Sequence, residues 1–136
     1  FTMPYNCLCV RKNRPLLNHN FKVVGPDAPL VVEVDEDLVL PCSLHPNISA
    51  VDMTVEWERT DLYQTDNLVH VFKDFGDIND NQRQSYRGRT ALFKEELLRG
   101  NTSLKLSAVQ PSDEGVYKCI VCCLDVSCIY SMDFTR

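Results

Sequence analysis

From Phe21 onward, the chain consists of short runs of alternating apolar and polar residues, punctuated by turn-forming residues about every ten positions. We expect strands over residues 21–24, 30–34, 37–43, 53–59, 68–72, 90–93, 102–106, 115–121 and 129–134. No stretch with the 3.6-residue period of a helix competes with this pattern. Nine short strands in one chain predict an all-β sandwich of two packed sheets.

Side chains alternate between the two faces of a strand, so the pattern also predicts which residues face inward. We expect the inner positions to be apolar residues on the strands expected around 37–43, 53–59, 102–106 and 115–121. They are Leu38, Leu40, Cys42, Met53, Val55, Trp57, Leu104, Leu106, Tyr117, Cys119 and Val121.

One constellation narrows the type of sandwich. Cys42 is followed by Trp57 and then by the run Asp-Glu-Gly-Val-Tyr-Lys-Cys at 113–119. This order is typical of an immunoglobulin-like domain, in which each member has its own structural role. With nine strands, it predicts the variable (V-set) type. Such domains seldom catalyse reactions, so the question becomes what the surface binds.

We expect Cys42 and Cys119 to form the bridge between the sheets, with Trp57 packed against it. The bridge would close a loop of roughly 75 residues and contribute about 4 kcal/mol in the chain-entropy model. Tyr117 fits the tyrosine corner, and Gly115 would permit the turn before it.

A charged pair is expected at one end of the sandwich. Asp113 has a candidate partner in Arg89, because variable-type domains usually close this end with an arginine–carboxylate pair. Arg87 is the alternative partner.

Composition places the chain outside the cell and argues against nucleic acid. Seven cysteines among 136 residues are typical of an oxidising compartment. Asn47 and Asn101 each begin an N-glycosylation acceptor pattern. The net charge of −5 does not fit a partner rich in phosphate. The longest apolar run, 119–124, is far shorter than the ~20 residues of a membrane helix.

The remaining cysteines suggest a second bridge. Cys123 and Cys128 share a face by alternation and flank a turn, so we expect a hairpin disulfide between them. The Cys119-x-x-Cys122 spacing could suggest a metal knuckle, but residues three apart on a strand point to opposite faces. Cys7, Cys9 and Cys122 are then left, and a bond among them, an intermolecular bridge and a free thiol all stay open.

Residues 1–20 have no clear period and are expected to be an extension outside the domain, which we place at 21–136. A basic cluster at 11–14 follows the apolar stretch of this extension rather than preceding it, unlike a signal peptide. We interpret the cluster as a solvated tail.

Catalysis is not expected. His19, His45 and His70 are scattered, and no serine or carboxylate accompanies them in a catalytic pattern. We therefore predict neither an enzyme nor a cofactor, and no metal site.

Four segments resemble a particular family: residues 21–26, 68–73, 100–106, and 86–93 with its Tyr-Arg-Gly-Arg-Thr sequence. They are similar to butyrophilins, myelin oligodendrocyte glycoprotein and the T-cell costimulatory ligands. The resemblance implies the receptor-binding domain of a cell-surface ligand that regulates T-cell responses, as the ectodomain of a type I membrane protein or a secreted form. Any membrane contact would be made through a segment outside the printed sequence. A homophilic adhesion domain, with self-association into a homodimer, is the alternative.

In this family the front sheet engages the receptor, so the outward-facing residues of that sheet are the candidate binding residues. Alternation assigns them to a mixed apolar and charged face, which is the composition of a protein-binding patch. The candidates are Glu56, His70, Phe72, Lys118, Ile120 and Ile129.

Overall fold

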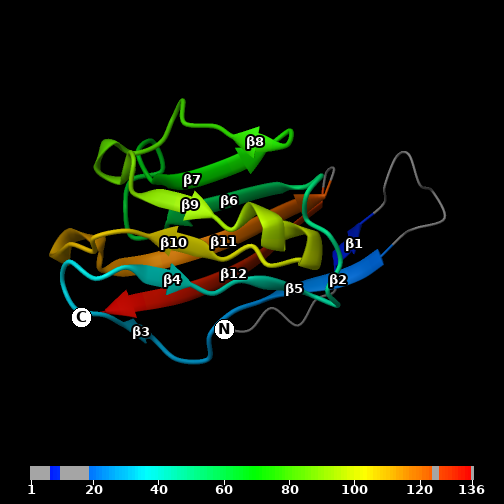
Figure 1. The fold of residues 1–136 in the computed structure, drawn as a ribbon, viewed down its shortest axis with the longest axis horizontal. Helices are drawn as coiled ribbons and strands as arrows, with labels where there is room; N and C mark the ends of the chain where they lie inside the picture. Colours follow the sequence, from blue (N-terminus) through cyan, green and yellow to red (C-terminus); the bar gives the residue numbers. More distant parts are fainter. Residues whose placement is uncertain (1–6, 10–18, 124–125, 136) are drawn as a thin grey trace.

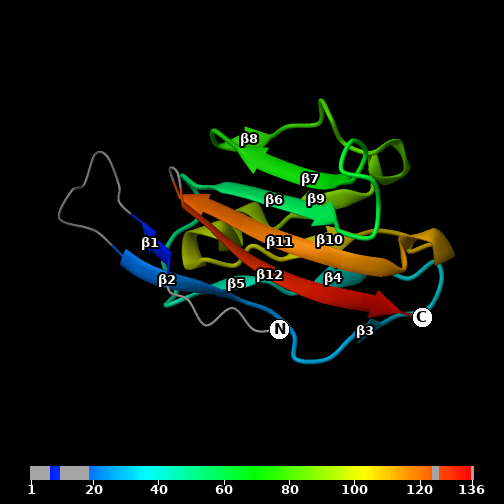
Figure 2. The same cartoon turned by 180° about the vertical axis from the view of Figure 1, so that it is seen from behind.

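The structure is a computed structural model that describes residues 7–9, 19–123 and 126–135. It confirms the expected sandwich, in which two layers of β-strands enclose one apolar core. Figure 1 shows the layer that contains β4, β9 and β10 toward the viewer, and Figure 2 shows the opposite layer.

The front sheet has six strands in the order β3-β12-β11-β6-β7-β8. All its neighbours are antiparallel except β3, which pairs parallel with β12. Its strands are β3 (Leu30–Val31), β6 (Thr54–Arg59), β7 (Leu68–Lys73), β8 (Gly76–Asp77), β11 (Gly115–Cys123) and β12 (Val126–Thr135).

The back layer is made of two three-stranded sheets, β4-β10-β9 and β1-β2-β5, which an isolated bridge between Ser43 and Asn101 connects. Within the described residues, the 3-10 helices η1, η2 and η3 lie in the connections β8–β9, β9–β10 and β10–β11. The elements are β1 (Cys7–Cys9), β2 (His19–Val24), β4 (Leu38–Leu40), β5 (Ser43–His45), β9 (Thr90–Leu92) and β10 (Leu104–Leu106), with η1 (Gln84–Tyr86), η2 (Lys94–Arg99) and η3 (Pro111–Asp113).

Each of the nine expected strands has a counterpart, with three differences. The strand expected over 37–43 ends at Leu40, and a separate strand, β5, begins at Ser43. The strand expected over 30–34 covers only Leu30–Val31. The sequence did not predict β1 or β8, because three-residue and two-residue strands are too short to show a period.

The core agrees with the alternation, since all eleven residues expected to face inward are buried. Cys42 and Cys119 form the predicted disulfide, with their Cα atoms 6.6 Å apart. Trp57 is fully buried as the register partner of Cys119, and its indole N–H donates to the carbonyl of Thr102 at 3.1 Å. The bridge and the indole thus tie the two layers together at the centre.

We call the cluster of Arg59, Tyr86, Arg89, Asp113 and Tyr117 the closed end of the sandwich. The Arg89 guanidinium forms the predicted ion pair with the buried Asp113 carboxylate. The Tyr117 hydroxyl donates to the carbonyl of Asp113 at 2.5 Å, which is the expected tyrosine corner. The alternative partner of Asp113, Arg87, is exposed.

A hydrogen-bonded chain runs through this cluster. Arg59 donates to the Tyr86 hydroxyl at 3.0 Å, and the Tyr86 and Tyr117 hydroxyls lie 2.7 Å apart. The requirement for Gly115 is steric, because a Cβ there would lie 2.4 Å from the Arg59 guanidinium. Arg59 therefore completes a buried polar network that the sequence did not indicate.

Candidate partner-binding face

The register of the front sheet places four outward side chains in one row across four strands. Val71 on β7 pairs with Glu56 on β6, Glu56 with Ile120 on β11, and Ile120 with Ile129 on β12. All four are half-buried. Val71 and Ile120 therefore flank the Glu56 carboxylate in the middle of the sheet, and Ile129 lies beyond Ile120. We call this row, together with Glu58 and Lys118, the front face.

Charged residues flank the row on the side of the closed end. Lys118 pairs in register with Glu58 on one side and with Ser131 on the other. Burial raises the pKa of Glu56 above its ordinary value, and the charge of Glu58 adds to this shift. The front face thus combines an apolar centre with charges at its margin, as protein-binding surfaces do.

Two of the six predicted binding residues, His70 and Phe72, do not lie on this face. Both are buried, with exposed fractions of 4% and 3%. His70 pairs with Trp57 and Phe72 with Val55, and both of these partners face the core. The expectation was therefore wrong for His70 and Phe72.

A β-bulge explains this error. The β6–β7 register shifts between Trp57 and Glu58, so that Glu58 pairs with Leu68 and Trp57 with His70. The intervening Val69 is buried as well, so two consecutive residues of β7 face inward. An extra residue reverses the alternation for the rest of a strand, which turns Val71 outward in place of Phe72.

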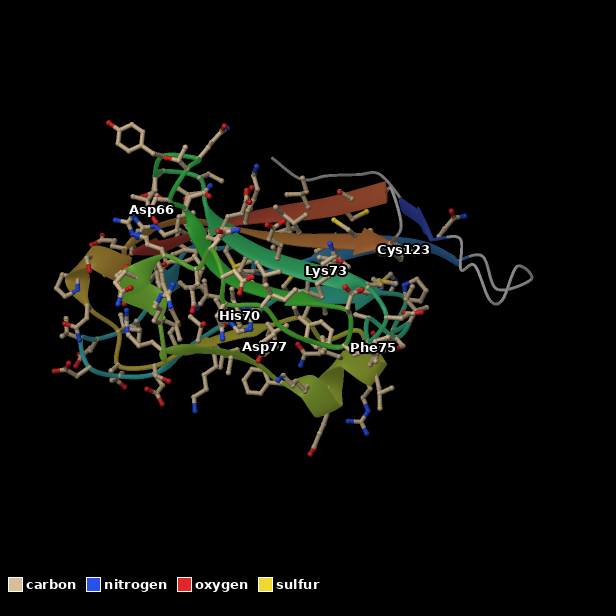
Figure 3. All side chains as sticks on the ribbon, turned by 90° about the horizontal axis from the view of Figure 1, so that it is seen from above. Asp66, His70, Lys73, Phe75, Asp77 and Cys123 are labelled. Atoms are coloured by element: carbon tan, nitrogen blue, oxygen red, sulfur yellow. A yellow bond between two sulfur atoms is a disulfide. The ribbon has the colours of Figure 1, made fainter. Side chains whose placement is uncertain are left out.

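His70 has a structural role at the edge of the sandwich. Its Nδ1 lies 2.8 Å from the Thr90 hydroxyl and its Nε2 lies 3.0 Å from Asp77 Oδ1. Figure 3 labels His70 and Asp77, which lie next to each other. Lys94 contacts the other oxygen of Asp77 at 2.8 Å. Burial raises the pKa of Asp77, but the hydrogen bonds from Lys94 and His70 together outweigh it, so that pKa is lowered. His70 thus links β7 to β8 and β9.

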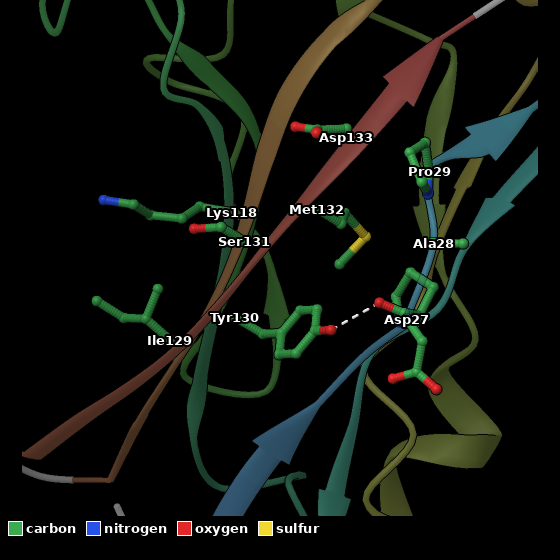
Figure 4. Close-up of a pocket in the computed structure, with 10 residues that line it drawn as sticks. Asp27, Ala28, Pro29, Lys118, Ile129, Tyr130, Ser131, Met132 and Asp133 are labelled. Carbon is green, nitrogen blue, oxygen red and sulfur yellow. Dashed lines mark hydrogen bonds between the residues drawn. The ribbon is translucent and has the colours of Figure 1, made fainter. Parts of the chain in front are cut away.

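A groove continues the front face beyond β12. It has a volume of about 540 Å³ and lies between β12 and residues 26–29. In Figure 4, Lys118, Ile129 and Ser131 project on one side of β12, whereas Tyr130 and Met132 project toward residues 26–29. The Tyr130 hydroxyl donates to the carbonyl of Pro26 at 2.6 Å and so closes the floor of the groove.

The cysteines near the β11–β12 hairpin differ in oxidation state. Cys122 is a free, half-buried thiol whose Sγ lies 3.1 Å from the Ser127 hydroxyl. Cys123 and Cys128 are buried and disulfide-bonded. The register places Cys123 opposite Val126 and Cys128 opposite Val121, so the two cysteines are not directly opposite each other. Their bond to each other stays a prediction. The side chains of Cys7 and Cys9 lie outside the described part of the structure.

The two predicted glycosylation sites lie away from the front face. Asn47 and Asn101 line the same depression, together with Ser43 and residues 24–26 of the back layer. Asn47 is exposed and Asn101 is half-buried, and the Asn101 side-chain oxygen accepts a hydrogen bond from the Ser103 amide at 3.1 Å.

This part of the chain, residues 7–9, 19–123 and 126–135, contains no group of three or more His, Cys, Asp or Glu residues arranged to hold a metal ion. None of its helices is long and apolar enough to cross a membrane.

Comparison with known proteins places the chain in a family. The immunoglobulin V-set domain model matches residues 25–135. Human butyrophilin-like protein 2 is 38% identical over 101 residues, which cover 74% of this chain and 20% of that protein. Human V-set domain-containing T-cell activation inhibitor 1 is 38% identical over 88 residues, which cover 65% of this chain and 30% of that protein.

A solved structure supports the same assignment. The crystal structure of the human B7-H4 IgV-like domain superimposes with a TM-score of 0.72 at 30% identity, covering 84% of this chain and 95% of that domain. The domains of this family are not enzymes. The chain spans less than a third of the length of either curated relative named above. It belongs to the immunoglobulin V-set domain family and is related to the butyrophilins and to B7-H4.

Proposed function

We propose that this domain is the extracellular receptor-binding domain of a butyrophilin-like cell-surface ligand that regulates T cells through its front face. One observation carries the proposal: Val71, Glu56, Ile120 and Ile129 form a single outward-facing row in which two apolar side chains flank the carboxylate. Apolar side chains that stay at the surface of a sheet, with charges at their margin, favour a protein partner.

The relatives supply the class of partner. One of them is named a T-cell activation inhibitor, and it shares 38% identity with the aligned part of this chain. The Cys42–Cys119 disulfide fits an extracellular location, where such bonds persist.

Glycans at Asn47 and Asn101 belong to the same proposal. Both asparagines border one depression of the back layer, so carbohydrate there would cover that side and leave the front face open to a receptor. Asn47→Gln and Asn101→Gln should each increase the electrophoretic mobility of protein from mammalian cells. This difference should disappear after enzymatic deglycosylation.

A fluorescent tetramer of the domain, applied to a panel of resting and activated lymphocytes, tests the function. The native tetramer should stain T cells, and Ile120→Asp should reduce its affinity at least about tenfold, as expected for a central interface residue. Val39→Asp is the matched control, because Val39 is an exposed apolar residue on β4 in the back layer.

The outcomes separate a ligand from an adhesion module. Staining that survives Ile120→Asp in a folded variant contradicts the use of the front face. Unstained lymphocytes together with clustering of beads that carry the domain would indicate homophilic adhesion instead.

A further inference from the structure

The turn between β7 and β8 carries an aromatic residue in an unfavourable backbone conformation. Lys73 pairs with Gly76, so Asp74 and Phe75 are the two central residues of a tight hairpin. Their φ angles are 52° and 66°. Positive φ at both positions is the condition for a type I′ turn, whose preferred sequences are Asn-Gly and Asp-Gly. Phe75 occupies the position where glycine is preferred.

Packing does not explain this phenylalanine. Its side chain is 70% exposed, so it contributes little to the core. A bulky residue at positive φ is an outlier in folded proteins, and such outliers concentrate at functional sites. A residue that breaks the local rule of its turn without a gain in packing is therefore a candidate for a role in binding.

The position of Phe75 relates it to the front face. The last residues of β7 lie beside the first residues of β6, since Phe72 pairs with Val55, and Thr54 pairs with Cys122 near the end of β11. The β7–β8 turn and the β11–β12 hairpin therefore lie at one end of the sheet, as Figure 2 shows. We call this the open end, and it comprises Asp74, Phe75, Cys122 and Ser127.

The open end and the front face fit within one interface. Four positions along β7 and its turn separate Val71 from Phe75, a span of at most about 14 Å. A standard interface covers about 800 Å² per partner, which includes this span. A receptor seated on Val71 and Ile120 would thus extend over the turn that carries Phe75.

We propose that Phe75 is an aromatic anchor that inserts into an apolar pocket of the receptor bound at the front face. This inference rests on the proposed function. Phe75 is largely exposed in the turn, so binding would bury its ring without rearrangement of the core. Buried aromatic side chains are among the commonest determinants of affinity in protein interfaces.

The variant Phe75→Gly tests the anchor, because it changes stability and binding in opposite directions. It creates the preferred Asp-Gly turn, and we expect its melting temperature to rise by about 3 °C. Its tetramer should lose at least about tenfold in affinity for the cells that the native tetramer stains. The matched control is Tyr63→Ser, which removes an aromatic ring that is 88% exposed and should leave staining unchanged.

Three outcomes would contradict parts of this inference. Undiminished staining by Phe75→Gly, alongside loss of staining by Ile120→Asp, overturns the anchor and leaves the front-face proposal standing. A fall in melting temperature contradicts the strained turn. If the native tetramer neither stains cells nor clusters beads, the anchor falls together with the proposed function.

Discussion

The closed end and the open end of the sandwich differ in whether their side chains are buried and bonded within the domain. At the closed end, Arg59, Tyr86 and Tyr117 form a chain of hydrogen bonds that reaches the Asp113 carbonyl, and all three are buried. At the open end, Phe75 is exposed and Cys122 is a free thiol. The closed end stabilises the fold, while the open end leaves an aromatic ring and a thiol accessible to a partner.

The largest expected effect is at the closed end. Asp113→Ala removes a buried carboxylate that accepts hydrogen bonds from Arg89 and, at 2.8 Å, from the Gln110 amide. Removing one partner of such an ion pair should lower the free energy of unfolding by about 3 kcal/mol. Urea denaturation measures this change. The exposed Asp66, paired with Arg83, is the control, and Asp66→Ala should cost less than about 1 kcal/mol. If Asp113→Ala and Asp66→Ala lowered the free energy of unfolding equally, the buried pair would stabilise the fold no more than the exposed one.

Tyr117→Phe tests the hydrogen-bonded chain without changing the shape of the core. It removes the bond to the Asp113 carbonyl and leaves the buried Tyr86 hydroxyl without its neighbour. Leaving buried polar groups unsatisfied should lower the free energy of unfolding by about 2 kcal/mol. Tyr63→Phe removes an exposed hydroxyl and should change stability by less than about 0.5 kcal/mol. Binding of cells by either variant should match that of the native tetramer.

Two carboxyls should give opposite pH dependences. The raised pKa of Glu56 means that the folded state holds its proton more tightly than the unfolded state. Stability should therefore fall as pH rises from the ordinary glutamate pKa through the raised one, and Glu56→Gln should abolish this fall. The lowered pKa of Asp77 has the reverse sign. Its contribution is present above the ordinary aspartate pKa and is lost as pH falls through the lowered value.

Urea denaturation at several pH values between 3 and 7 measures both contributions. The free energy of unfolding of the native domain minus that of Glu56→Gln should decrease with rising pH. The free energy of unfolding of the native domain minus that of Asp77→Asn should increase with rising pH. Parallel profiles for the native domain and both variants would contradict the assigned environments.

The smallest effect is expected at the open end. Cys122→Ser should change the free energy of unfolding by less than about 0.5 kcal/mol, because the thiol is half-buried and makes no disulfide. Alkylation of the native protein should label Cys122 and spare Cys42, Cys119, Cys123 and Cys128. Peptide mapping of the same sample without reduction tests the predicted Cys123–Cys128 bond. Label on Cys123 or Cys128 would contradict the oxidised state of the hairpin.

The central strands were predictable because simple alternation holds there. On β6 and β11, Glu56, Lys118 and Ile120 lie on the front face as expected, and Val55, Trp57 and Cys119 are buried. The edge was not predictable, since the bulge opposite Trp57 and Glu58 reverses the faces of β7. A bulge is defined by the pairing of two strands, so the sequence of one strand does not reveal it. His70 and Phe72 were misplaced for this reason, and Val71 was missed.

The sequence by itself determined the sandwich, its disulfide between Cys42 and Cys119, and the tyrosine corner of Tyr117. Each of these follows from local alternation or from residue types at fixed spacing. Only the tertiary structure decided that Val71 completes the front face and that Phe75 lies in a turn that favours glycine. The physical reason is that strand register and turn dihedral angles arise when separate segments pair, and this pairing sets the direction of every side chain at the edge of the sheet.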